Sequence, residues 1–203
     1  WDALYYNSTG NYNTATGLRA LYSNSTGNDN TASGLMALSL NTTGNSNTAA
    51  GRAALYSNTT GYSNVAVGPR ALFENLTGHN LVAVGDSALY NNTALGNTAI
   101  GSKSLYTNTT GSSNSALGDH SLYSNTSGLS NTAVGDDAMY NNSTGDYNAA
   151  LGRLSMNSNT TGNFNTTIGY SAGSLATTNA NCTFLGYNAD NSGGTSRSNS
   201  MAL

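Results

Sequence analysis

The sequence predicts an all-β parallel β-solenoid with about one coil per 17 residues. Glycine recurs at a fixed interval, apolar residues recur at fixed positions between these glycines, and the rest of each unit is rich in Gly, Asn and Thr, which are poor helix formers. The interval is 17 residues at every step except from Gly85 to Gly101, where it is 16. Such a unit is too short for a helix pair or a leucine-rich repeat. Identical residues are therefore expected to stack about 4.8 Å apart.

The recurring glycine, position 0 from here on, is predicted to form a structural corner, because glycine adopts positive φ without steric cost. The corner glycines are Gly17, Gly34, Gly51, Gly68, Gly85, Gly101, Gly118, Gly135, Gly152, Gly169 and Gly186. Asn recurs at positions −4 and +7, Ala at −2, Leu or Met at +4, and a second glycine at +10. We interpret Gly96 as that second glycine displaced by one in the short unit. Residues 1–186 are expected to form eleven coils, and 187–203 a terminal irregular coil of the same array.

Each coil is predicted to contain two short strands, at −4 to −1 and at +3 to +5, with a polar outer arc from +6 to +12. Both strands carry apolar residues at consecutive positions, as in Ala20-Leu21-Tyr22. Because side chains alternate between the two faces of a strand, both faces would require burial. A single coil has only one interior, so we expect the chain to form a homo-oligomer.

The motifs N-T-A-V-G, N-T-A-I-G and N-S-A-L-G resemble the head repeats of trimeric autotransporter adhesins. The longer unit T-G-x-x-N-T-A-x-G-x-x-A-L-Y is similar to repeats of large bacterial surface proteins and phage-type tail fibres, and residues 181–189 and 198–203 resemble terminal coils of such arrays. The resemblance covers nearly the whole chain, although its repeat is longer than that of the adhesin heads. It implies a left-handed β-roll, a parallel homotrimer, and a place outside the cell, on its surface or on a virion tail.

Composition excludes several classes of protein. Only 7% of residues are charged and the net charge is −3, so we expect no nucleic-acid partner. No apolar run approaches the roughly 20 residues of a membrane span. Cys182 is the single cysteine, which excludes a disulfide within the chain. Trp1 is not an initiator methionine and no signal peptide precedes it, so we expect the chain to have been cut or processed.

Few residues suggest chemistry, and we expect neither catalysis nor a cofactor. His79 and His120 belong to no motif with zinc-like spacing, and no nucleophile–base pair stands out. The weak metal candidates are Asp119, Asp136 and Asp137, which could attract Ca²⁺, because Asp119 and Asp136 occupy the same column in adjacent coils and Asp137 lies beside them. A solvated corner, relieved by Arg153 in the next coil, is the favoured interpretation of these carboxylates.

Two columns have alternative interpretations. The tyrosines at +5 are predicted to pack by stacking, with sugar or receptor binding as the alternative. The asparagines of N-x-S/T motifs can form a hydrogen-bonded ladder or accept glycans. These possible glycosylation sites are Asn7, Asn24, Asn41, Asn58, Asn75, Asn91, Asn108, Asn125, Asn142 and Asn159.

The favoured function is a non-catalytic structural or adhesive extracellular fibre segment, with itself and possibly a host-surface glycan or protein as partners. The alternative is the protomer of a glycan-coated extracellular filament. A third class, an ice- or polysaccharide-binding solenoid, requires one flat and regular threonine face.

Overall fold

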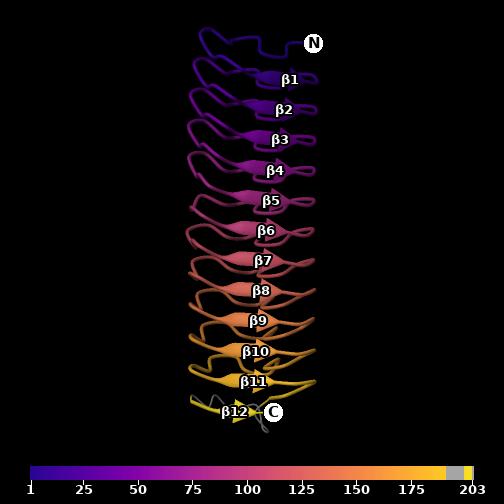
Figure 1. Cartoon of the computed structure of the whole chain (residues 1–203), viewed down its shortest axis with the longest axis vertical. Coiled ribbons are helices and arrows are strands. Elements are labelled where there is room, and N and C mark those ends of the chain that lie inside the picture. The colour runs from indigo at the N-terminus through magenta and orange to yellow at the C-terminus, as the bar shows by residue number, and fades with distance from the viewer. Residues whose placement is uncertain (191–198, 203) are drawn as a thin grey trace.

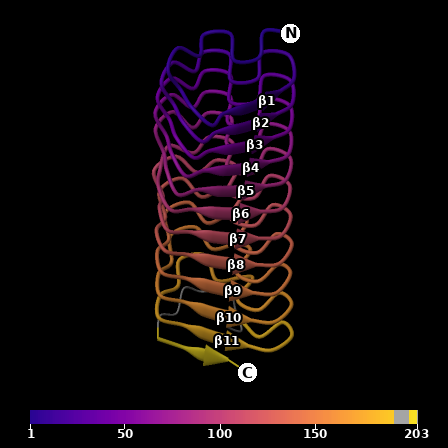
Figure 2. The same cartoon turned by 45° about the horizontal axis from the view of Figure 1, so that its top comes forward.

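A computed structural model describes residues 1–190 and 199–202 as an elongated rod of stacked coils, with the two ends of the chain at opposite ends of the rod (Figure 1, Figure 2). Within these residues, one parallel sheet contains twelve strands in chain order. The strands are β1 (Thr14–Thr16), β2 (Thr31–Ser33), β3 (Thr48–Ala50), β4 (Val65–Val67), β5 (Val82–Val84), β6 (Thr98–Ile100), β7 (Ser115–Leu117), β8 (Thr132–Val134), β9 (Ala149–Leu151), β10 (Thr166–Ile168), β11 (Thr183–Leu185) and β12 (Met201–Ala202). The predicted 17-residue β-solenoid is confirmed.

Strand register follows the repeat. Each strand occupies positions −3 to −1, and equivalent residues pair from coil to coil, as Ala32 pairs with Ala49. The short unit keeps this register, because Val82 of β5 pairs with Thr98 of β6. β12 extends the sheet beyond β11, while the remainder of the predicted terminal coil, residues 191–198 and 203, lies outside the described residues.

The predicted second strand at +3 to +5 is wrong, because the residues at +2 and +4 have left-handed backbone conformations. Arg19 has φ 56° and Leu21 has φ 49°, and equivalent residues repeat these values along the rod. The amide of Leu21 donates to Ala37 O of the next coil (3.0 Å), whereas that of Arg19 donates to Trp1 O of the preceding one (3.2 Å). Bonds to both neighbouring coils hold a conformation that costs an isolated L-residue about 1–2 kcal/mol.

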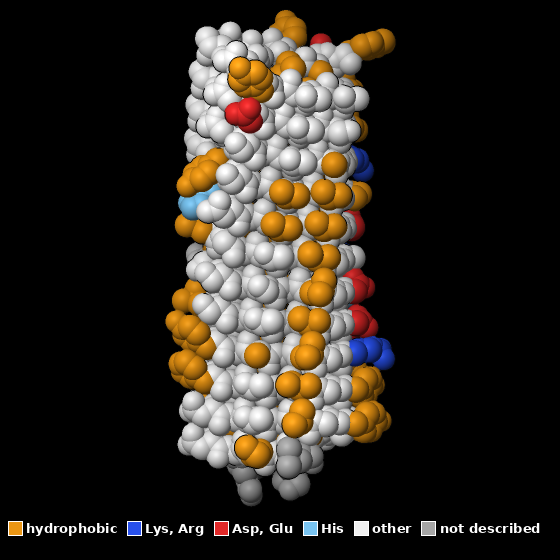
Figure 3. Space-filling model, viewed as in Figure 1, with side chains coloured by type: hydrophobic (Ala, Val, Ile, Leu, Met, Phe, Trp, Pro, Cys, Tyr) orange, Lys and Arg blue, Asp and Glu red, His pale blue; other side chains and the backbone are white. Residues whose placement is uncertain are grey.

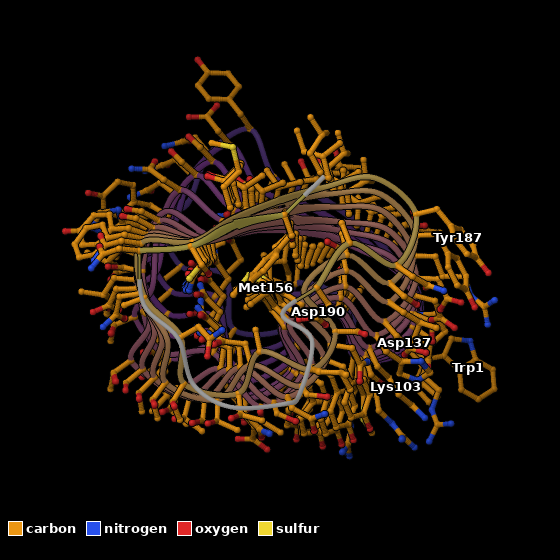
Figure 4. The ribbon with its side chains drawn as sticks, turned by 90° about the horizontal axis from the view of Figure 1, so that it is seen from below. Trp1, Lys103, Asp137, Met156, Tyr187 and Asp190 are labelled. Atoms are coloured by element: carbon orange, nitrogen blue, oxygen red, sulfur yellow. The ribbon has the colours of Figure 1, made fainter. Side chains whose placement is uncertain are left out.

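The interior is built from small and branched residues facing each other across the coil. Ala at −2 and Leu or Met at +4 are almost all fully buried, and Met156 points into this interior (Figure 4). Ala20 and Leu21 are both fully buried although they are adjacent in sequence. The positive φ of Leu21 thus removes the alternation of faces that an extended strand would show, so this segment has no second apolar face that requires a partner.

Two asparagine ladders run through the same interior. In the +7 ladder, Asn41 Nδ2 donates to Asn24 Oδ1 of the preceding coil (2.7 Å) and to Gly44 O of its own coil (3.0 Å). In the −4 ladder, Asn47 Nδ2 donates to Asn30 Oδ1 (3.1 Å), and its backbone amide donates to the same oxygen (3.0 Å). The predicted ladder at +7 is therefore confirmed, but its predicted place in an outer arc is wrong. The asparagines can be buried because each side-chain amide bonds to the identical amide of the next coil.

The short unit interrupts both ladders. Leu81 replaces asparagine at −4 and is fully buried, and Asn75 Oδ1 is a buried acceptor without a hydrogen-bond partner.

The interpretation of Gly96 as a displaced +10 glycine is wrong. Its amide donates to His79 O and its φ is 65°, so Gly96 occupies position −5, where other coils have residues such as Ser113 with φ 60°. The deletion lies earlier, where Ala94 O accepts from Asn92 Nδ2 as the +10 glycine carbonyl does elsewhere (2.9 Å).

The coil that ends at Gly186 has a different, apolar interior. Ala176 and Cys182 stand where earlier coils have asparagine, and both are buried. Phe184 replaces the small residue at −2 while Gly173 replaces leucine at +4, and a Cβ built on Gly173 would lie 2.9 Å from the Phe184 ring. The large and small positions are thus exchanged, which conserves the core volume. Among the described residues there is no helix of the length and hydropathy needed to cross a membrane.

Candidate functional site

The outward face of the sheet carries an apolar column. Position −1 is aliphatic in eight successive coils and its side chains point away from the interior. We call this column the aliphatic stripe: Val67, Val84, Ile100, Leu117, Val134, Leu151, Ile168 and Leu185. Leu117 is 47% exposed and Leu151 49%, and hydrophobic side chains form a line down this face (Figure 3). Strand alternation places −2 inside and −1 outside, so here the predicted two-sided apolar strand is confirmed.

The same face lacks the regular double threonine array that ice binding requires. Position −3 also points outward and is threonine in most coils, but only β1 (Thr14–Thr16) has threonine at both −3 and −1. From β4 onward the −1 position is aliphatic, and β4 and β5 have valine at −3 as well. The face is therefore half polar and half apolar over most of its length.

A second column, at +5, contains stacked aromatic rings. This ring column consists of Tyr56, Phe73, Tyr90, Tyr106, Tyr123 and Tyr140, with centroids 5.0–5.3 Å apart. Each ring is half-buried, and ring faces cover one another along the rod, as the packing interpretation predicts. Burial, and then the charge of Glu74, raise the pKa of the Tyr90 hydroxyl, while Arg70 is close enough to oppose that rise.

Two hollows lie between the ring column and the charged corner at +1 and +2. The first has a volume of about 600 Å³ and is lined by Ala53, two arginines and three aromatic residues, among others. The second, of about 550 Å³, lies where the ring column ends at Tyr140, and it is lined by His120 and Asp137. The two hollows thus have opposite charge although they lie in equivalent columns.

The acidic corner brings together more groups than the sequence indicated. Asp119, His120 and Asp136 each place one possible ligand atom within 4.8 Å of the others, and His120 Nδ1 lies 3.7 Å from Asp137 Oδ1. His120 was not included among the possible metal ligands predicted from the sequence, although its place at position +2 beside Asp119 is visible in the repeat. Arg153 Nε donates to Asp136 Oδ2 at 3.0 Å, as the favoured interpretation expected. One of the three carboxylates at this corner is therefore paired with an arginine, and the other two lie beside the His120 imidazole.

Comparison with protein-family models, with curated proteins and with solved structures finds no match to this chain.

The glycosylation interpretation does not fit the placement of its asparagines. Asn24, Asn41, Asn58, Asn75, Asn108, Asn125, Asn142 and Asn159 are fully buried inside the coil. A glycan is attached through Nδ2 and needs solvent, yet Nδ2 of Asn58 donates to Asn41 Oδ1 and Gly61 O. Asn7 and Asn91 are only half-buried. Asn91 lies beside Asn92, which takes the ladder position in the short unit and accepts from Asn97 and Asn108.

Asp137→Asn is expected to stabilise the fold near neutral pH. Burial, and then the negative charge of Asp136, raise the pKa of the Asp137 carboxyl above its ordinary value. The folded state thus binds this proton more tightly than the unfolded state does, and stability is lost as the pH rises through the raised pKa. Near pH 7 the Asn variant should have a higher melting temperature, with a free energy of unfolding larger by less than about 1 kcal/mol. Below about pH 3 it should match the parent. Asp86→Asn, at an exposed carboxylate, is the control; a lower melting temperature of the Asp137 variant at pH 7 would contradict the expectation.

Proposed function

We propose that this chain is a segment of an extracellular structural or adhesive fibre, without catalytic activity, that associates side by side with copies of itself. The observation that carries the proposal is the aliphatic stripe, because it is continuous over β4–β11 on a rod whose surface is otherwise mostly polar. At about 4.8 Å per coil its eight side chains extend over roughly 34 Å. An apolar row of this length is typical of a surface that another protein covers.

The repeat supports a mechanical role for the rod. Coils bond to their neighbours through the sheet and the turn amides, and most of them also through two side-chain ladders. Such a stack grows without changing its cross-section, so it can hold a binding surface at a distance from its anchor. The resemblance to adhesin heads and tail fibres supports three parallel copies and a location on a cell surface or virion. The burial of the N-x-S/T asparagines weighs against the glycan-coated filament.

Leu117→Lys is expected to weaken self-association. A lysine in the middle of a covered apolar stripe would bury an unpaired charge, which should raise the dissociation constant by roughly tenfold or more. The measurement is light scattering after gel filtration at micromolar concentration, where the parent chain should have a multiple of the 20.7 kDa chain mass.

Leu129→Lys is the matched control, because Leu129 is also exposed (36%) but lies at position +11, away from the sheet face. It should leave the mass unchanged. Neither substitution removes a core contact, so the melting temperature of the dissociated chain should stay near that of the parent. A parent chain that is a stable monomer under these conditions would overturn the proposal of side-by-side association.

A further inference from the structure

We propose that the first hollow, centred on Ala53, binds a carboxylated sugar unit of an acidic polysaccharide. This inference deepens the adhesive part of the proposed function by naming a site and a ligand class, and it does not depend on the oligomeric state. The hollow lies between the +1 and +2 positions on one side and the ring column on the other.

The hollow exists because one side chain in the +2 column is short. Met36 and Arg70 stand at the same position in the coils before and after Ala53, and both have long side chains. Ala53 has φ 55° and is buried, so the space above its methyl group is left between Met36 and Arg70. With a volume of about 600 Å³, this space is within the range of small-ligand sites, roughly 300–1,000 Å³.

The walls of the hollow combine apolar surface with positive charge. Leu35, Met36, Tyr56 and Phe73 supply apolar surface to its walls. The C–H surface of a pyranose ring packs well against such side chains, because their contact removes apolar area from water.

Arg52 and Arg70 also line the hollow, and both are exposed. Within the described residues the ion pairs involve only Arg153 and His120 as cationic groups, so neither guanidinium is paired with a carboxylate of this chain. A planar guanidinium binds a carboxylate through two parallel hydrogen bonds, which favours a carboxylated over a neutral sugar.

The hollow is open to solvent at the surface of the rod, which favours a unit within a polymer over an enclosed small molecule. The corner carries two more cations, Arg19 two coils before Arg52 and Lys103 two coils after Arg70, with the carboxylate of Asp86 in the coil between Arg70 and Lys103. These four cations extend over five coil steps, roughly 24 Å at 4.8 Å per step. The second hollow carries Asp137 instead of an arginine, so the same ligand should avoid it.

Titration calorimetry with oligogalacturonate, its methyl ester and oligoglutamate tests the proposal. The carboxylated sugar should bind, and both the neutral ester and the acidic peptide should bind at least tenfold more weakly. The double variant Arg52→Gln, Arg70→Gln should weaken sugar binding by roughly tenfold or more, since both charge-assisted contacts are lost. Ala53→Met should abolish measurable binding by filling the hollow with a side chain that the column already accepts at Met36.

Arg153→Gln is the control, because Arg153 lies at the same corner but pairs with Asp136 outside the hollow. It should leave binding unchanged. Absence of binding to the oligogalacturonate, equal binding of its ester or of oligoglutamate, or full binding by the Ala53→Met variant would each overturn the site. Leu117→Lys should bind the oligogalacturonate like the parent, because Leu117 does not line the hollow. A loss of self-association can therefore be distinguished from a loss of sugar binding.

Discussion

Gly135→Ala is expected to lower the free energy of unfolding by at least about 3 kcal/mol. Gly135 has φ 134°, in a region that only glycine adopts readily, and an added Cβ would lie 2.6 Å from both the carbonyl carbon and oxygen of Gly152 in the next coil. The clash is with backbone, so no side chain can rotate away. The measurement is the denaturation midpoint at fixed protein concentration, since association shifts apparent stability.

Gly96→Ala is the matched control for this substitution. Gly96 also has positive φ, 65°, but the nearest atom to an added Cβ is Ser113 Oγ at 3.9 Å. Its position is occupied in other coils by residues such as Ser130, with φ 54°. The expected loss is about 1 kcal/mol or less, which is the left-handed cost without a clash. If both glycine variants lose the same stability, close approach of the coils is not what requires the corner glycine.

Asn125→Ala is expected to cost about 3 kcal/mol or more, because it leaves several buried polar groups without partners. Asn125 Nδ2 donates to Asn108 Oδ1 (2.7 Å) and Gly128 O (3.1 Å), and Asn125 Oδ1 accepts from Asn142 Nδ2 (2.9 Å). All three asparagines are fully buried, so water cannot replace the lost bonds. Thermal or chemical denaturation of the variant measures the loss.

An exposed asparagine provides the comparison for that variant. Asn45 Oδ1 accepts from the Asn28 backbone amide at 2.7 Å, but this pair is open to solvent. Asn45→Ala should therefore cost less than about 1 kcal/mol, because water takes the place of the lost acceptor. A loss for Asn125→Ala no larger than for Asn45→Ala would show that the interior ladder contributes little beyond filling space.

The repeat alone was sufficient to predict the solenoid, the corner glycines and the stacking of equivalent residues. Each of these follows from a period that cannot accommodate a helix pair and from glycine at a single phase of the coil. The outward position of the aliphatic stripe also follows from the sequence, because Ala at −2 and an aliphatic residue at −1 must point to opposite faces of a strand. The predicted need for a covering partner depends on this column alone.

The conformation of the segment after the corner could not be predicted in the same way. Leucine does not favour positive φ, so Leu55 in an Ala-Leu-Tyr run reads as part of an extended strand. Its amide bonds to Ala71 O of the next coil, and that contact exists only once the coils are stacked. Tertiary hydrogen bonding here overrides a local preference.

The asparagine at +7 is the second case. Within one coil, Asn58-Thr59-Thr60 has the composition of an exposed turn, and burying a single amide there would be unfavourable. The structure buries it because Asn41 and Asn75 supply equivalent amides above and below. The hollow at Ala53 arises in the same way, from the difference between its side chain and those of Met36 and Arg70 in the adjacent coils. The repeat determines which residues are equivalent, and strand alternation alone places position −1 outside. After the corner and at +7, only the stack decides which residues face inward, since the groups that stabilise them belong to the neighbouring coils.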